Sequence, residues 1–314
     1  MRFVGLALIL LSYPLLLSLL KSFPQQRKWA YFAVGIVPFT MGSLNLDVAI
    51  INWAGWPGYV KGLIITILDS LALVIIMTSR RPFRRLPLWG VLLAYLSAAT
   101  LSMVFSNMPT SSGFYAFQIF RISLVFVAVA SIMNDPKAIK WVGMGLAAGA
   151  MFQFGVTIEQ KFSGAIQASG TMGHQNLLGL MLHFVTFPLL ALMLAGEKSK
   201  IIMLGALSSV LAVALGASRG AIGFAAIGLV ILFALSLARH ATQHKWKLLG
   251  LAALAMAAVM PITIETLSAR FGDSPIDTSA DGERQAFERA AKAMWADYPM
   301  GVGANQYVVM ANTE

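Results

Sequence analysis

Long runs of apolar residues alternate with short polar breaks along most of the chain. About ten of these runs are long enough, or nearly so, to cross a hydrocarbon core about 30 Å thick. They cover residues 3–20, 30–50, 62–78, 87–106, 114–133, 141–158, 176–195, 201–217, 221–238 and 248–266. The second run fits a span least well, because it contains Pro38, Asn45 and Asp47. The pattern predicts an all-α polytopic membrane protein with about ten transmembrane helices.

The composition agrees with a membrane protein. The 314 residues are 58% hydrophobic and 11% charged, whereas soluble domains carry about 25% charged residues. The chain has no cysteine, which excludes disulfides, thiolate metal sites and cysteine nucleophiles. The first run lacks a basic leader and a clear small-residue cleavage site, so we expect a span there rather than a cleaved signal peptide.

Basic residues gather in alternate connections between the runs. Five connections hold fourteen of the 23 Lys and Arg residues, and the opposite connections hold at most one each. The fourteen are Lys21, Arg27, Lys28, Arg80, Arg81, Arg84, Arg85, Lys137, Lys140, Lys198, Lys200, Arg239, Lys245 and Lys247. The positive-inside rule therefore predicts that these five connections are cytoplasmic and that the N-terminus is outside. The net charge of +10 then reflects orientation in the membrane, and we expect no nucleic acid as a partner.

The composition changes after the last apolar run. Residues 1–266 are predicted to form the transmembrane domain, and residues 267–314 the start of a large periplasmic loop. This tail holds seven of the thirteen acidic residues. Apolar residues recur at helical spacing near 282–296, which predicts an amphipathic helix near the membrane surface. Because no closing span follows, we expect the chain to be part of a longer protein.

Several polar residues fall on the predicted outer side. Arg219 lies in the short turn between the eighth and ninth runs, and His174 directly precedes the seventh. Arg121 lies inside the fifth run, about 10 Å deep at the helical rise per residue. The tail region adds Arg270 and Arg284. Arginine keeps its charge, and its planar fork binds phosphate oxygens in pairs, so arginines gathered at an outer membrane surface favour a diphosphate ligand.

Three of these arginines also have a simpler interpretation. Arg219 alone is compatible with a side chain that snorkels to lipid phosphates. For Arg121 the alternative is a structural role, with bonds to helix carbonyls or to Gln118. Arg284 is equally typical of the polar side of an amphipathic helix. The ligand interpretation therefore depends on several arginines meeting at one site.

The histidines have alternatives as well. A histidine before a helix is commonly a hydrogen-bonding cap, and Asn176 is the predicted N-cap of the seventh run. His183 lies within that run and is predicted to be packed and hydrogen-bonded rather than a ligand. The sequence contains no Gly-rich nucleotide loop, no HExxH and no Asp-x-Asp pair. We therefore expect neither a metal nor a cofactor.

Three short motifs occur in order between roughly residues 160 and 310. Gly170 to Gly179 read GTMGHQNLLG, and Ser218 to Ala221 read SRGA. Arg284 and Trp295 are followed by PMGVG. These resemble the GT-x-GHxNxxG, SRGA and R…W…P-x-GVG motifs of the O-antigen ligase / O-antigen polymerase family. The first half of the chain resembles the family only as a run of hydrophobic spans.

The resemblance implies a GT-C-like, all-helical enzyme of the bacterial inner membrane, active on the periplasmic face. Members transfer a glycan from undecaprenyl diphosphate to lipid A–core, a growing polysaccharide or a protein hydroxyl, without metal. Arg219 and Arg284 match the arginines that hold the diphosphate, with Arg121 and Arg270 as further candidates. The family's general-base histidine lies further along the loop, and no histidine follows His244. We expect that histidine, and about two more spans, beyond Glu314, with His174 the catalytic candidate within this chain.

A transporter or flippase for an anionic lipid-linked or small solute is the alternative function. It would use the same arginines for binding without chemistry. Many transporters contain internal repeats, and the turn around Arg219 has no counterpart in the first half of the chain. The sequence therefore favours the transferase.

Overall fold

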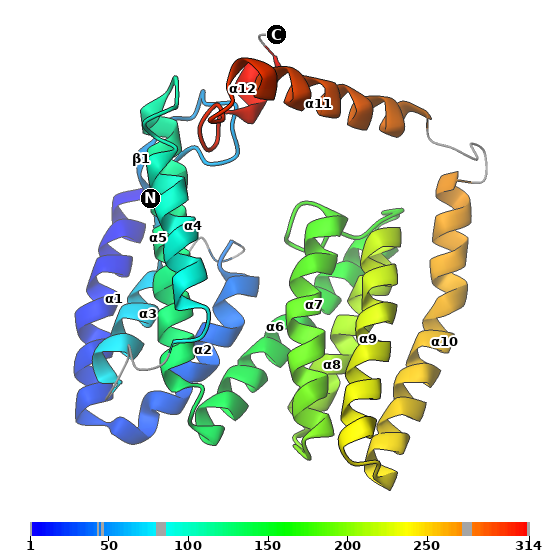
Figure 1. Cartoon of the computed structure of the whole chain (residues 1–314). Helices are drawn as coiled ribbons and strands as arrows, with labels where there is room; N and C mark the ends of the chain where they lie inside the picture. Colours follow the sequence, from blue (N-terminus) through cyan, green and yellow to red (C-terminus); the bar gives the residue numbers. More distant parts are fainter. Residues whose placement is uncertain (1, 43, 45–46, 80–85, 272–277, 313–314) are drawn as a thin grey trace. The chain divides into compact units, whose positions relative to one another are not determined.

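The computed structural model describes residues 2–42, 44, 47–79, 86–271 and 278–312. It is mostly helical (Figure 1). The predicted basic group Arg80, Arg81, Arg84 and Arg85 lies outside the described residues. The backbone is described at Arg270 and Arg284, but their side chains are not.

The helices and strands follow one another along the chain with short connections. They are α1 (Arg2–Ser22), the 3-10 helix η1 (Pro24–Gln26), α2 (Arg27–Thr40), β1 (Asp47–Asn52), β2 (Gly62–Thr66), α3 (Ile67–Thr78), α4 (Trp89–Leu101), α5 (Pro109–Ile132), α6 (Pro136–Phe162), α7 (Gln175–Leu194), α8 (Lys200–Gly216), α9 (Arg219–Arg239), α10 (Gln243–Phe271), α11 (Thr278–Asp297) and α12 (Tyr307–Ala311). Within the described residues, α1, α5, α6, α7 and α9 are long and apolar enough to cross a membrane. Helices α3, α4 and α8 are apolar but shorter. The mostly helical membrane architecture is as predicted, whereas the part of the chain that the structure describes contains five such helices rather than ten.

The prediction is wrong for part of the second and third runs. Helix α2 ends at Thr40, and residues 47–52 form β1, which pairs antiparallel with β2. The run at 62–78 thus begins as a strand and becomes helical only at Ile67. Both strands are rich in β-branched residues, and the loop between them contains glycine and proline, a combination that favours a hairpin. Short apolar runs do not by themselves distinguish a strand from a helix, so the all-α prediction missed this hairpin.

The chain divides into two compact units. Unit 1 comprises Met1–Arg27, Asn45–Asp135 and Ile276–Glu314, and unit 2 comprises Lys28–Leu44 and Pro136–Pro275. The predicted domain boundary at residue 266 falls inside α10, which runs without a break to Phe271. Each unit is described by itself below.

Unit 1 is built around α3, which packs against both α1 and α5. The Ser70 hydroxyl of α3 donates to the Ile9 carbonyl of α1 at 3.0 Å. Helix α4 packs along α5, where the hydroxyls of Tyr95 and Tyr115 lie 2.7 Å apart. Polar side chains thus tie apolar helices together by pairing with each other or with backbone groups, as expected for helices in lipid.

Residues 303–306, which we call the docked segment, return to unit 1 and interlock with it. The Asn305 side chain donates to the carbonyls of Val60 (2.8 Å) and Ser111 (3.1 Å) and accepts from the Val60 N–H (3.1 Å). Gln306 is 1% exposed and donates to the Ser111 hydroxyl. Buried amide side chains require such partners, so these hydrogen bonds hold the segment in place.

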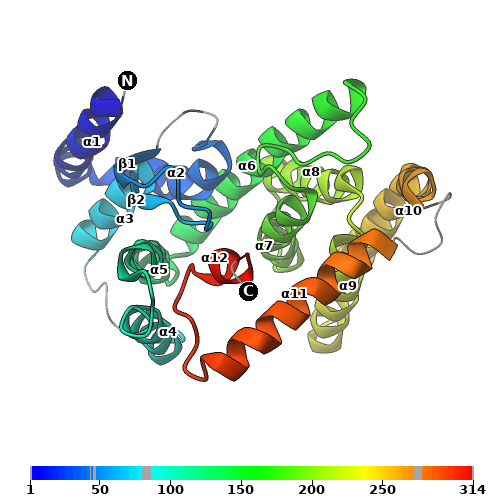
Figure 2. The same cartoon turned by 90° about the horizontal axis from the view of Figure 1, so that it is seen from above.

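Unit 2 is a bundle in which α6, α7 and α8 form the centre. Helices α7 and α8 lie side by side in both views (Figures 1 and 2). The fully buried residues at their contact include Leu178, Leu182 and Leu189. Glycine allows the backbones to approach closely elsewhere: a side chain at Gly145 would meet α2, and one at Gly205 would meet α6. Small residues at helix contacts are the usual means of packing helices in membranes.

Candidate functional site

The turn between α8 and α9 carries the SRGA motif. Helix α8 ends at Gly216, Ala217 takes the left-handed conformation with φ 46°, and Ser218 caps α9. The Ser218 hydroxyl accepts from the Ala221 N–H at 3.4 Å. Arg219 is therefore the first residue of α9, and it is exposed. The predicted short break around one arginine is confirmed.

The GTMGHQN segment leads into α7 beside this turn. His174 is the N-cap of α7, and its Nδ1 accepts from the Asn176 N–H at 3.1 Å. This confirms the capping interpretation of His174, whereas the prediction of Asn176 as the N-cap is wrong. The Asn176 carbonyl oxygen Oδ1 instead accepts from the Ser218 hydroxyl at 2.7 Å. That hydrogen bond joins two motifs that are more than forty residues apart in the sequence.

The two motifs also meet one turn further into the bundle. Gly179 of α7 packs directly against Ala221 of α9, where any larger residue at 179 would collide. His183 lies 2.9 Å from the Ala221 carbonyl through Nε2 and stacks on Phe187. The prediction that His183 is packed and hydrogen-bonded is confirmed. Small residues in both motifs thus allow α7 and α9 to begin side by side at one end of unit 2, which we call the motif end.

Three glutamines that we did not single out from the sequence shape the motif end. Gln160 of α6 accepts from the N–H groups of residues 169 and 170 at 2.9 Å each. Gln153, which is fully buried, accepts from the N–H of residue 171 at 3.0 Å. Gln167 donates to the Ala217 carbonyl at 2.9 Å. The sequence held one signal for two of them: Gln153 and Gln160 are seven residues apart, so they share one face of α6.

The motif end is arranged to attract an anion. Helices α7 and α9 both begin there, and helix starts expose N–H groups and the positive end of the helix dipole. The exposed Arg219 adds a permanent charge to this end. His174 is exposed as well, and because Nδ1 already accepts a hydrogen bond, the neutral ring carries its proton on Nε2. The arrangement suits a group with several oxygen acceptors, such as a phosphate.

Arg121 belongs to unit 1 and has different surroundings. Its guanidinium forms an ion pair with Asp69 at 2.7 Å and donates to the Gln118 amide oxygen at 2.5 Å and the Thr66 hydroxyl at 3.0 Å. Its side chain is 12% exposed. Gln118 was expected from the sequence, but the Asp69 partner was not, because it comes from a distant helix. These bonds support the structural alternative for Arg121.

The remaining two candidates, Arg284 and Arg270, lie on helices whose backbone is described, but their own side chains are not. Arg284 is in α11 of unit 1, which includes the amphipathic helix predicted at 282–296, and Arg270 is near the end of α10. Of the five candidates, His174 and Arg219 lie on the two segments that the hydrogen bond between Ser218 and Asn176 joins, within unit 2. The described residues include no group of three or more His, Asp or Glu that could hold a metal ion.

Comparison of the chain with known protein families, with curated proteins and with solved structures finds no match. The family resemblance of the three motifs therefore stays a prediction. The functional argument rests on the residues and contacts of the chain itself.

Proposed function

We propose that the protein transfers a glycan from undecaprenyl diphosphate to an acceptor at the periplasmic face of the inner membrane, as O-antigen ligases and polymerases do. A GT-C-like arrangement of about ten spans, with the motif end outside, belongs to this proposal. The observation that carries it is the hydrogen bond between Ser218 and Asn176, which gathers Arg219 and His174 at one polar end of unit 2. A diphosphate at the lipid–water boundary is the ligand that such an end suits best.

The proposed reaction is a single displacement at the anomeric carbon of the sugar. The acceptor hydroxyl oxygen forms the new bond to that carbon, and its proton passes to a general base. The bond between the sugar and the diphosphate breaks, and the diphosphate leaves with the electron pair. Arg219 and the helix starts at the motif end stabilise the growing negative charge.

The geometry of His174 changes the role that we propose for it. A general base needs a free lone pair, but the Nδ1 lone pair of His174 already accepts the Asn176 N–H. The exposed Nε2–H is instead a donor, and it suits a phosphate oxygen. We therefore assign His174 to diphosphate binding rather than to proton transfer.

The test is release of undecaprenyl diphosphate by the purified protein. It would be incubated with an undecaprenyl-diphosphate glycan and lipid A–core, polysaccharide or protein acceptors, with and without EDTA. Arg219→Ala should reduce release by about 100-fold or more, the usual loss when one charge-stabilising donor is removed. Arg239→Ala, at the opposite end of the same helix, is the matched control and should release at the wild-type rate. Wild-type release by Arg219→Ala would contradict the proposal.

Transport of an anionic lipid is the second candidate. It would use the same motif end, because Arg219 and the helix starts there suit an anionic head whether or not chemistry follows. The same assay separates the two functions. Binding of the lipid-linked glycan without release would favour the transporter.

A further inference from the structure

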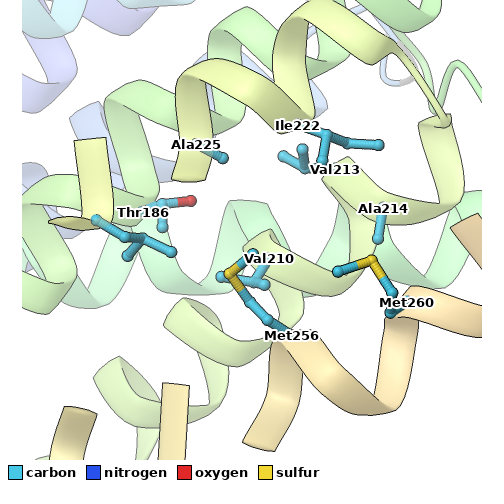
Figure 3. A pocket seen from close by; sticks show the side chains of 9 residues that line it. Thr186, Val210, Val213, Ala214, Ile222, Ala225, Met256 and Met260 are labelled. Carbon is cyan, nitrogen blue, oxygen red and sulfur yellow. The ribbon is translucent and has the colours of Figure 1, made fainter. Parts of the chain in front are cut away.

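An apolar cavity of about 70 Å³ lies among α7, α8, α9 and α10 of unit 2 (Figure 3). It is lined by Thr186, Val210, Val213, Ala214, Ile222, Ala225, Leu229, Met256 and Met260. The Thr186 hydroxyl lies 2.8 Å from both the Leu182 carbonyl and the Ser209 hydroxyl, so its hydrogen-bonding capacity is used within the bundle. The walls of the cavity therefore favour hydrocarbon over water.

The cavity begins directly beneath the motif end. Ile222 follows Arg219 by three residues, which is about 4.5 Å along the helix axis, and Leu229 lies about 15 Å from it. On α8, Val213 and Ala214 line the cavity from the last turn before Ala217. An apolar chain whose charged head lies at Arg219 would thus reach the cavity within its first few carbon atoms.

The cavity also leads to the surface of the bundle. Its lining changes from Thr186, which is 2% exposed, to Met260, which is 49% exposed. Met260 is shared with a second, shallower hollow along α10 that includes Ala257 and Pro261. Pro261 has no N–H to offer the Ala257 carbonyl, so the helix is locally loosened where the two hollows meet. A long chain can therefore enter from the side of α10 rather than through the turn.

We propose that this cavity receives the first isoprene units of the polyprenyl tail while the diphosphate lies at Arg219. The inference rests on the proposed function and adds the site for the apolar part of the donor. A water needs only about 10–15 Å³ of such space, so the cavity holds several carbon atoms of a branched chain. The flexible side chains of Met256 and Met260 can adapt to the methyl branches and double bonds of an isoprenoid. The permanent charge next to the cavity selects a lipid with an anionic head.

The first experiment fills the cavity. Ala225→Phe places a large side chain in it, and Val230→Phe, at a 70% exposed position of the same helix, is the matched control. Each variant is assayed with two donors that carry the same glycan diphosphate, one with an undecaprenyl tail and one with a methyl group. Ala225→Phe should lower kcat/KM for the undecaprenyl donor by about tenfold, the effect of a modest loss of binding. It should leave the methyl donor within about twofold, and Val230→Phe should change neither. Equal loss for both donors would overturn the tail site while leaving the transferase in place.

The second experiment maps the site without requiring turnover. A polyprenyl diphosphate with a diazirine in its first isoprene unit is photolysed in the wild-type protein, and labelled peptides are identified by mass spectrometry. We expect label at Met256 and Met260 that undecaprenyl diphosphate displaces and vesicles of phosphatidylglycerol do not. Label confined to other helices, or displaced equally by the vesicles, would overturn the site. Label at α10 in a complete protein that transfers no glycan would support the lipid site and overturn the proposed function.

Discussion

Arg121 and Arg219 are both arginines among apolar helices, yet their surroundings differ in almost every respect. The Arg121 side chain is 12% exposed and directs its N–H groups at Asp69, Gln118 and Thr66. Arg219 is exposed at the first residue of α9, beside the start of α7. The first arginine completes a set of internal partners, and the second adds charge to a surface that already attracts anions.

The difference shows why an arginine in a membrane sequence does not reveal its role by position alone. A buried guanidinium needs a carboxylate to offset its loss of hydration, and Asp69 supplies it. Arg219 lies exposed at a helix start, where water hydrates the guanidinium and a buried carboxylate is not required to offset lost hydration. A substitution at Arg121 should therefore lower mainly the stability of the protein, and a substitution at Arg219 mainly its activity.

The largest expected effect on stability is at Arg121. Arg121→Met leaves Asp69 without its ion-pair partner and should lower the free energy of unfolding by about 3–5 kcal/mol. Arg219→Met, at an exposed position, should change it by less than about 0.5 kcal/mol while abolishing most transfer. Thermal unfolding in detergent measures the first quantity, and diphosphate release the second. Asp69→Asn added to Arg121→Met should recover part of the lost stability, and a stable Arg121→Met protein would contradict the structural assignment.

A smaller effect is expected where the two motifs join. Asn176→Ala removes the acceptor of the Ser218 hydroxyl and should lower kcat/KM for transfer about tenfold and stability by about 1 kcal/mol. Asn176→Asp keeps an acceptor oxygen but places a negative charge beside the proposed diphosphate site. Compared with Asn176→Ala, this variant should therefore regain the lost stability but not the lost rate of glycan transfer. If Asn176→Asp restored both, Asn176 would be a purely structural link and the anion site would lie elsewhere.

The smallest effect concerns an exposed ion pair at the opposite end of unit 2. Lys140 donates to Glu197 at 3.0 Å, and this hydrogen bond lowers the pKa of the Glu197 carboxyl below its ordinary value. A lowered pKa in the folded state gives stabilisation that is present near neutral pH and is lost as the pH falls through that lowered value. Lys140→Ala should reduce stability by less than about 1 kcal/mol at pH 7, because the pair is exposed to solvent. In thermal unfolding, this difference from the wild type should disappear in acid; a difference that persists there would show that Lys140 acts through packing.

The sequence predicted three helices of unit 2 well because length and hydrophobicity decide them, whereas α6 and α10 extend four or five residues beyond their predicted runs at each end. Helices α7, α8 and α9 each begin and end within two residues of the predicted runs. The hairpin of β1 and β2 was missed because its strands are short and apolar, and only their pairing distinguishes them from helix. Helices decided by length and hydrophobicity were thus easier to predict than backbone pairing between segments.

The sequence predicted single residues of the candidate site, but not the hydrogen bonds that connect them. Arg219 and His174 were found because charged or polar residues are rare beside membrane spans. The bond from Ser218 to Asn176 and the partner Asp69 of Arg121 were not, because both depend on which helices become neighbours. The role of His174 changed for the same reason, since the backbone N–H that occupies its Nδ1 is known only once the cap geometry is known.

The docked segment has a consequence for the order in which the protein is made. The Asn305 side chain donates to the carbonyl of Ser111, 194 residues earlier in the chain. At translation rates of about 5–20 residues per second, the ribosome needs on the order of 10–40 s to synthesise the intervening chain. Helices α6 to α11 are all synthesised in this interval, so the Ser111 carbonyl gains this partner only after most of unit 2 has been made.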